Sequence, residues 1–284
     1  MPTYKTSIIE KFFRERYDEQ SNALSNPIVT LEEVKLAIAS HNLATTATES
    51  EKNPANFIKD FMRNVDTANE NWPAYVREQG YRCRHRTGKG AHFEFVLIPD
   101  DRVLPFKKFV PSDQTVSHQI QSVSLPLASR RLGRKDEPWM IQVITRLKIV
   151  ESHFSLSSGR AMRQLDLLQM SVKLSGTEID ALFLAHEEVE KGKYEETIVT
   201  CEAKVGRDDI LEDQILRQAQ APFRMKTIDQ NQVIPIAIKC VAPSVIYICE
   251  FEALTRANFA TTDALVVAHE SLFEIKPSVP GICE

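Results

Sequence analysis

Asp180, Glu202 and Lys204 are the residues whose types and spacing could do chemistry together. Glu202 and Lys204 flank Ala203 in an apolar, strand-like segment, so the alternation of side chains along a strand places both on one face. Asp180 lies in a second apolar segment, EIDALFLAH, and the acidic, polar HEEVEKGKYEE between the two segments is typical of a hairpin connection. Pairing of these two strands would bring Asp180 beside Glu202.

Charged side chains on apolar strands cost free energy unless they are paired or bind a cation. Two carboxylates and one backbone carbonyl, for which Ala203 is the candidate, are enough to hold Mg²⁺. Such an ion lowers the pKa of a bound water and neutralises charge that develops on a phosphate. Lys204 would orient or help to deprotonate that water, or contact the phosphate. The alternative is an ion pair on a surface strand with no chemical role.

This arrangement resembles the PD-(D/E)xK nuclease superfamily. In that family an Asp ends or follows one strand, a Glu/Asp-x-Lys tripeptide lies on the next strand, and a helix follows. Asp180 matches the first position, although Ile179 replaces the usual proline. Glu202-Ala203-Lys204 matches the tripeptide. The resemblance implies a Mg²⁺-dependent nuclease in which the two carboxylates and the carbonyl of Ala203 bind the metal.

Two further residues enter through the resemblance, which covers roughly residues 137–252. Gln214, on the helix after the tripeptide, matches a polar residue often found near the active site of the family. Glu151, on a helix that precedes the sheet, is the candidate for an additional upstream carboxylate. The alternatives are that Gln214 and Gln218 form a polar helix stripe, and that Glu151 is one of the ordinary charges of its helix.

The first part of the chain has helical and hairpin patterns. Apolar spacing predicts helices over residues 8–20, after a capping box that starts at Thr30, and after Pro54. Two strand-like runs, residues 81–86 and 93–98, flank a Gly-Lys-Gly turn and predict a β-hairpin. Helices followed by a basic hairpin resemble a winged helix, a variant of the helix-turn-helix DNA-binding arrangement.

Basic side chains in this hairpin are candidates for DNA contact. Arg82, Arg84 and Arg86 recur with a period of two, which would place three guanidinium groups on one side of a strand, and Lys89 lies in the turn. Such a row suits contact with backbone phosphates. The alternative is a solvated hairpin face. A second basic cluster at residues 130–135 is interpreted as part of a solvated linker, with phosphate contact as the alternative.

Apolar runs of strand length dominate from about residue 164 onward, and one helical segment near residues 208–223 interrupts them. This order predicts an α/β (α+β) fold with a mixed sheet. The predicted organisation is a winged-helix-like domain over residues 1–99, a linker over 100–136 and a catalytic domain over 137–284.

Composition limits the class of protein. The 284 residues carry a net charge of −4, and 43% are apolar and 26% charged, which is ordinary for a soluble protein. Residues 1–136 hold 20 Lys and Arg against 17 Asp and Glu, whereas residues 137–284 hold 15 against 22. The 5 cysteines are scattered without a C-x-x-C pair, which argues against a disulfide framework and a structural zinc site. We found no secretory signal or membrane-spanning pattern, so the expected location is cytoplasmic.

Taken with the winged-helix-like front part, the nuclease resemblance points to type II restriction endonucleases. Such enzymes cut short palindromic sites in double-stranded DNA, usually as homodimers, because a two-fold protein matches a two-fold site. One alternative is a nuclease of the same core that serves repair, recombination or modification-dependent restriction. Another is a winged-helix DNA-binding regulator without catalysis.

Overall fold

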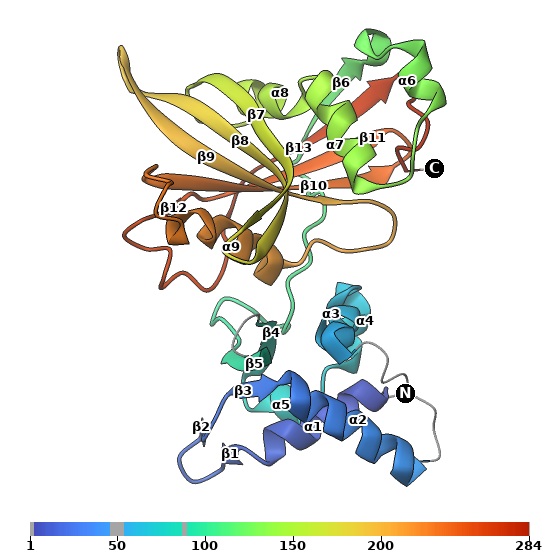
Figure 1. The fold of residues 1–284 in the computed structure, drawn as a ribbon, viewed down its shortest axis with the longest axis vertical. Coiled ribbons are helices and arrows are strands. Elements are labelled where there is room, and N and C mark those ends of the chain that lie inside the picture. The colour runs from blue at the N-terminus through green and yellow to red at the C-terminus, as the bar shows by residue number, and fades with distance from the viewer. Residues whose placement is uncertain (1–2, 46–53, 87–89, 284) are drawn as a thin grey trace. The chain divides into compact units, whose positions relative to one another are not determined.

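The computed structural model of the chain describes residues 3–45, 54–86 and 90–283. Contacts divide the chain into two compact units, Met1–Lys108 and Phe109–Glu284. The protein is of the mixed α/β type, with a large mixed sheet in the second unit and helices in both (Figure 1). No helix among the described residues is long and apolar enough to span a membrane.

The first unit combines short helices with a small antiparallel sheet of the order β3-β5-β4. Its elements are α1 (Tyr4–Arg14), β1 (Tyr17–Asp18), β2 (Ala23–Leu24), β3 (Ile28–Thr30), α2 (Leu31–Thr45), η1 (Pro54–Asn56), α3 (Phe57–Met62), α4 (Val65–Asn71), α5 (Ala74–Glu78), β4 (Tyr81–His85) and β5 (Ala91–Leu97). Aromatic side chains fill its core, where the rings of Phe13 and Phe95 lie 5.2 Å apart between centroids.

The predicted capping box at Thr30 is confirmed. The backbone N–H of Glu33 donates to Thr30 Oγ1 at 3.2 Å, and the backbone N–H of Thr30 donates to Glu33 Oε2 at 2.7 Å. These two bonds satisfy N–H groups that have no partner inside a helix, so they fix where α2 begins. The helix predicted over residues 8–20 is wrong in its extent, because α1 ends at Arg14 and Tyr17 pairs with Leu24.

The predicted hairpin is confirmed as β4 and β5, which pair antiparallel from Tyr81 opposite Leu97 to His85 opposite Phe93. The turn that joins them includes Lys89 and lies outside the described residues.

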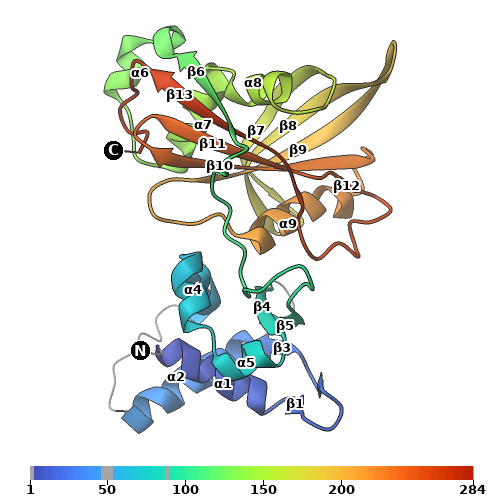
Figure 2. The same cartoon turned by 180° about the vertical axis from the view of Figure 1, so that it is seen from behind.

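The second unit is built on one long sheet with helices on both faces (Figure 2). Its elements are β6 (Val116–Gln121), η2 (Ser122–Ser124), α6 (Leu127–Arg131), α7 (Glu137–Arg146), α8 (Ile149–Leu156), β7 (Met162–Leu174), β8 (Thr177–Glu190), β9 (Lys193–Lys204), α9 (Glu212–Gln220), η3 (Pro222–Arg224), β10 (Gln232–Ala242), β11 (Val245–Phe251), β12 (Leu254–Thr255) and β13 (Val267–Lys276).

The strand order is β6-β13-β11-β10-β9-β8-β7, and β12 pairs with β10. Strand β10 runs parallel to β9, because α9 carries the chain across between them, and β6 runs parallel to β13. One face of the sheet packs against α7 and α8, and the other packs against α9. The prediction of a mixed sheet with one crossover helix is therefore confirmed.

The structure differs from the predicted linker over residues 100–136. The units divide after Lys108, and β6 and α6 belong to the second unit. Strand β6 lies at the edge of the sheet and most of its side chains are exposed, so its sequence lacks the apolar alternation that marks a half-buried strand.

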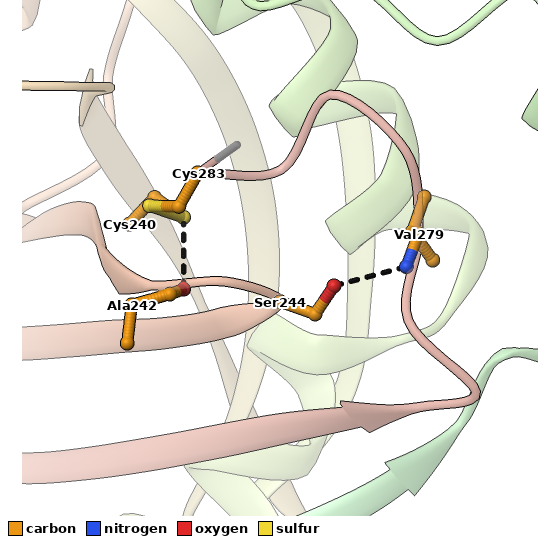
Figure 3. The surroundings of a disulfide bond; sticks show 5 residues. All are labelled: Cys240, Ala242, Ser244, Val279 and Cys283. Atoms are coloured by element: carbon orange, nitrogen blue, oxygen red, sulfur yellow. Dashed lines mark hydrogen bonds between the residues drawn. A yellow bond between two sulfur atoms is a disulfide. The ribbon is translucent and has the colours of Figure 1, made fainter.

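A disulfide bond joins Cys240, in β10, to Cys283 in the C-terminal segment (Figure 3). The sequence argued against a disulfide framework and gave no signal for this single bond; the other three cysteines, Cys83, Cys201 and Cys249, are buried thiols. The two bonded cysteines are 43 positions apart in the sequence, a separation that forms no recognisable spacing motif. Their Cα atoms lie 5.8 Å apart, within the range that a disulfide spans.

Candidate active site

Strands β8 and β9 form the predicted hairpin and place the three candidate residues together. Ala181 pairs with Cys201, and Asp180 and Glu202 are the next residues along their strands. Ala181 and Cys201 both belong to the core under α7 and α8. Because successive side chains of a strand alternate, Glu202 and Lys204 point to the face that α9 covers. Asp180 reaches them at the end of the β8–β9 pairing, through its hydrogen bond to the backbone of Ala203.

Hydrogen bonds fix both carboxylates. Asp180 Oδ2 accepts the backbone N–H of Ala203 at 2.8 Å. Glu202 Oε1 pairs with the ammonium group of Lys204, and Glu202 Oε2 accepts the side-chain amide of Gln218. The predicted convergence of Asp180, Glu202 and Lys204 is therefore present in the structure.

Burial distinguishes this cluster from a surface ion pair. Glu202 is 0% exposed, and the side chain of Lys204 is 16% exposed. Removing two charged groups from water costs several kcal/mol per ion, and a single ion pair does not reliably offset that cost. The cluster is therefore not the solvated, energetically neutral pair that was the alternative to a functional site.

Burial raises the pKa of both carboxyl groups of the cluster. The pKa of Glu202 is raised to about 7, mainly by burial and in part by the charge of Asp180, while Lys204 and Gln218 oppose the shift. Burial also raises the pKa of Asp180, although the N–H of Ala203 and the charge of Lys204 act against it. Two neighbouring carboxylates, each with a raised pKa, are more stable as anions when a positive ion lies between them.

Lys204 is held in its charged form. Burial by itself lowers the pKa of this amine, but the charge of Glu202, followed by that of Asp180, outweighs burial and raises the pKa above its usual value. An amine that is protonated at neutral pH cannot accept a proton from water. Lys204 therefore acts here as a fixed positive charge and hydrogen-bond donor.

The carbonyl of Ala203 lies on the same side as Asp180. In an antiparallel pair the N–H and C=O of one residue point to the same neighbouring strand. Since the N–H of Ala203 reaches Asp180, its carbonyl oxygen is also directed toward β8. Two carboxylates and this carbonyl are the hard oxygen donors that Mg²⁺ prefers. Within the described part of the chain, no cluster of three or more His, Cys, Asp or Glu side chains could hold a metal.

Gln218, not Gln214, is the glutamine that contacts Glu202. Its amide group donates to Glu202 Oε2 and to the carbonyl oxygen of Glu178, the latter at 3.0 Å. Gln218 lies one turn further along α9 and is buried, whereas Gln214 is half-buried. Because residues four apart lie on the same side of a helix, the sequence did not show which glutamine would contact Glu202. The position of α9 against the sheet decides it.

Glu137, not Glu151, is the upstream carboxylate whose charge reaches the site. Glu151 forms an ion pair with Lys148 at 2.7 Å. Glu137, in the first turn of α7, contributes to the electrostatic environment of both Asp180 and Lys204. Helix α7 ends before Lys148, which has φ 56°, so Glu151 lies on a separate helix, α8.

The predicted row of arginines in β4 is not an open basic face. Arg82 is 3% exposed, so its guanidinium group is inside the first unit. Arg84 and Arg86 both form ion pairs with Glu94 on β5, and the Arg86 pair measures 2.8 Å. A buried carboxylate between two arginines neutralises part of the positive charge that would attract a phosphate.

A second buried polar cluster lies elsewhere on the sheet. His153 Nδ1 lies 2.7 Å from Ser271 Oγ, and His153 Nε2 lies 3.1 Å from Glu250 Oε2. All three residues are fully buried, so a substrate cannot reach the serine. These hydrogen bonds satisfy polar groups inside the core, and the cluster has a structural role.

No protein-family model, curated protein or solved structure matches this chain.

Proposed function

We propose that the chain is a Mg²⁺-dependent endonuclease that hydrolyses phosphodiester bonds in double-stranded DNA at specific sites, as type II restriction enzymes do. One observation carries the proposal: Asp180, Glu202 and Lys204 meet at the end of the β8–β9 hairpin, with the backbone of Ala203 beside them. This is the arrangement that resembles the PD-(D/E)xK core. A binding protein without catalysis has no need for a buried carboxylate pair of this cost.

The donor set fits a magnesium ion with bound water. Asp180 and Glu202 supply two anionic oxygens, and Ala203 supplies a neutral one. Gln218 is buried, and its Oε1 atom has no hydrogen-bond partner among the described residues. A buried acceptor in this condition is commonly satisfied by an ordered water. A water molecule bound to an ion next to Glu202 would supply a hydrogen-bond donor for Gln218 Oε1.

Each residue of the cluster has a separate task in the proposed reaction. When bound, Mg²⁺ would lower the pKa of a water molecule and offset negative charge on the phosphate. The N–H of Ala203 orients Asp180, and Gln218 orients Glu202. Lys204 would place its ammonium group against the attacking water or a phosphate oxygen, where a fixed charge stabilises the transition state without reorganisation.

The first unit is proposed to dock on DNA as a winged-helix-like module. Support comes from its element order, in which α1, β3, α2 and further short helices precede the β4–β5 hairpin, and from the strand order β3-β5-β4. In winged-helix proteins a helix enters the major groove and the hairpin contacts the flanking backbone. Two chains related by a two-fold axis would match a palindromic site, so a homodimer is part of the proposal.

The test is incubation of the purified protein with unmethylated plasmid or phage DNA and Mg²⁺, followed by gel electrophoresis. Discrete, reproducible fragments are expected. A smear, or cleavage confined to branched or modified DNA, would favour a repair, recombination or modification-dependent nuclease. Retarded but uncut DNA would instead support a DNA-binding regulator and contradict the proposed catalysis.

Replacement of Gln218 should impair cleavage. Gln218→Leu removes the amide that orients Glu202, and loss of a residue that supports a metal ligand typically lowers metal affinity or activity by about 10–100-fold. The measurement is the cleavage rate at several Mg²⁺ concentrations. Gln214→Leu, on the same helix, is the matched control and should leave the rate unchanged. Equal effects of the two substitutions would contradict the assignment of Gln218 to the site.

A further inference from the structure

Residues Arg130–Lys135, the end of α6 and the segment after it, form a positive surface on the second unit, which we call the basic loop. Arg131 and Lys135 are exposed, and the side chain of Arg134 is 72% exposed, although it pairs with Asp136. Arg130 instead donates to the backbone carbonyl of Ser122, which anchors the start of the loop. The loop is therefore an ordered part of the second unit and not a solvated linker.

The chain leads directly from the basic loop to the carboxylate cluster. Asp136 caps α7 by accepting the N–H of Trp139 at 3.0 Å, and Glu137 is the first residue of that helix. The charge of Glu137 acts on Asp180 and on Lys204. Lys135, the last residue of the basic loop, therefore lies two positions before Glu137 in the sequence, at the start of a helix that packs on β8 and β9.

The C-terminal segment packs closely against the basic loop. A Cβ atom on Gly133 would lie 2.4 Å from the carbonyl oxygen of Pro280, and one on Gly281 would lie 2.3 Å from that of Arg134. Gly281 also has φ 84°, a conformation that residues with a side chain rarely adopt. Both glycines are therefore required for the two backbones to approach each other.

Several bonds hold this C-terminal segment in place, among them the hydrogen bond from the backbone N–H of Ser244 to the carbonyl oxygen of Ile282 at 3.0 Å. The backbone N–H of Val279 donates to Ser244 Oγ at 2.9 Å, and Cys283 forms the disulfide with Cys240 (Figure 3). Trp139 Nε1 donates to the carbonyl of Pro280 at 3.0 Å. The basic loop therefore packs against a C-terminal segment that is itself held in place.

Cys240, the residue of β10 that forms the disulfide, lies at the same end of the sheet as the carboxylate cluster. Lys239, which precedes Cys240, is the register partner of Lys204 on β9. The disulfide therefore ties the C-terminal segment next to the strand end that carries the carboxylate cluster. Both routes, through α7 and through β10, place the basic loop at this end of the sheet.

We infer that the basic loop binds backbone phosphates of the DNA duplex next to the phosphate that is cut. The inference rests on the proposed nuclease function and extends it by naming a contact surface. DNA presents about one negative charge per 1.7 Å of its axis, and each phosphate neutralised by Lys or Arg adds salt-dependent affinity. Residues 137–284 hold 15 Lys and Arg against 22 Asp and Glu, so DNA approaching this acidic part needs a local positive surface.

The double substitution Arg131→Gln with Lys135→Gln tests this surface. We would measure binding of the full chain to a labelled DNA duplex by fluorescence anisotropy over a series of KCl concentrations, without Mg²⁺ so that no cleavage occurs. Each lost phosphate contact should flatten the slope of log K against log salt by about 0.9, so the double variant should lose about 1.8. The matched control is Lys191→Gln with Lys193→Gln, which removes two exposed lysines at the far turn of the β8–β9 hairpin and should leave the slope unchanged.

The outcomes separate this inference from the proposed function. If the unchanged protein binds and the two double variants have equal salt slopes, the basic loop does not contact DNA, while the nuclease proposal stands. If the unchanged protein binds no duplex at any salt concentration, the proposed function and the inference fail together. A flatter slope for the Arg131 and Lys135 variant alone, with an unaltered melting temperature, would support the inference.

Discussion

Lys204→Ala should lower the rate of DNA cleavage by about 10²–10³-fold, the range typical for loss of one preorganised donor that stabilises charge in the transition state. Two effects combine. The variant lacks the ammonium group that would stabilise the attacking water or the phosphate. It also leaves Glu202 without its cation, which raises the pKa of Glu202 further and weakens metal binding. DNA affinity, measured by anisotropy without Mg²⁺, should be nearly unchanged.

Lys193→Ala is the matched control for this prediction, because Lys193 is an exposed lysine at the other end of the same strand. It should cleave at the rate of the unchanged protein. Melting temperatures of both variants would show whether a loss of activity reflects unfolding. Turnover by folded Lys204→Ala at the original rate would refute the assignment of the site.

Binding of Mg²⁺ should depend strongly on pH around neutrality. Burial raises the pKa of Glu202 to about 7, and a protonated carboxyl group does not bind a cation well. Below that pKa the apparent Mg²⁺ affinity should fall about tenfold per pH unit, because binding releases one proton. The increase in melting temperature that Mg²⁺ causes should therefore be large at pH 8 and small at pH 6.

The metal-free protein should show the opposite trend. The pKa of Glu202 in the folded state is above its usual value of 4.5, so the folded state retains a proton that the unfolded state releases. This contribution to the free energy of unfolding is fully present below about pH 4.5 and is lost as the pH rises through 7. Glu202→Gln should remove both trends. A Mg²⁺-induced shift of equal size at pH 6 and pH 8 would contradict the role of Glu202 as a metal ligand.

The sheet around the site was predictable because each of its signals is local. The apolar runs that became β7 to β11 alternate or are continuous over strand length, and the polar segment with Gly192 gave the β8–β9 turn. The side-chain period of two then placed Glu202 and Lys204 on one face, independent of the rest of the fold. The hairpin pairing of the two strands then brought Asp180 next to Glu202.

The features that sequence analysis missed depend on contacts distant in the chain. Gln214 and Gln218 have equal spacing signals, and the direction of α9 decides which one meets Glu202. Glu137 acts on the site because α7 packs across the strands, which no spacing rule indicates. The burial of Arg82 likewise depends on the packing of the first unit, where its neighbour Cys83 in β4 is buried as well.

Because of the disulfide between Cys240 and Cys283, the covalent structure of the protein depends on whether its buffer contains a reducing agent. A thiol reagent such as dithiothreitol would add one hydrogen atom to each sulfur, and Pro280 would then depend on its hydrogen bond with Trp139 and on glycine packing for its position. Preparations made with and without such reagents are thus two chemical species. Mass spectrometry under native conditions distinguishes them, and the result belongs beside every affinity measured for this chain.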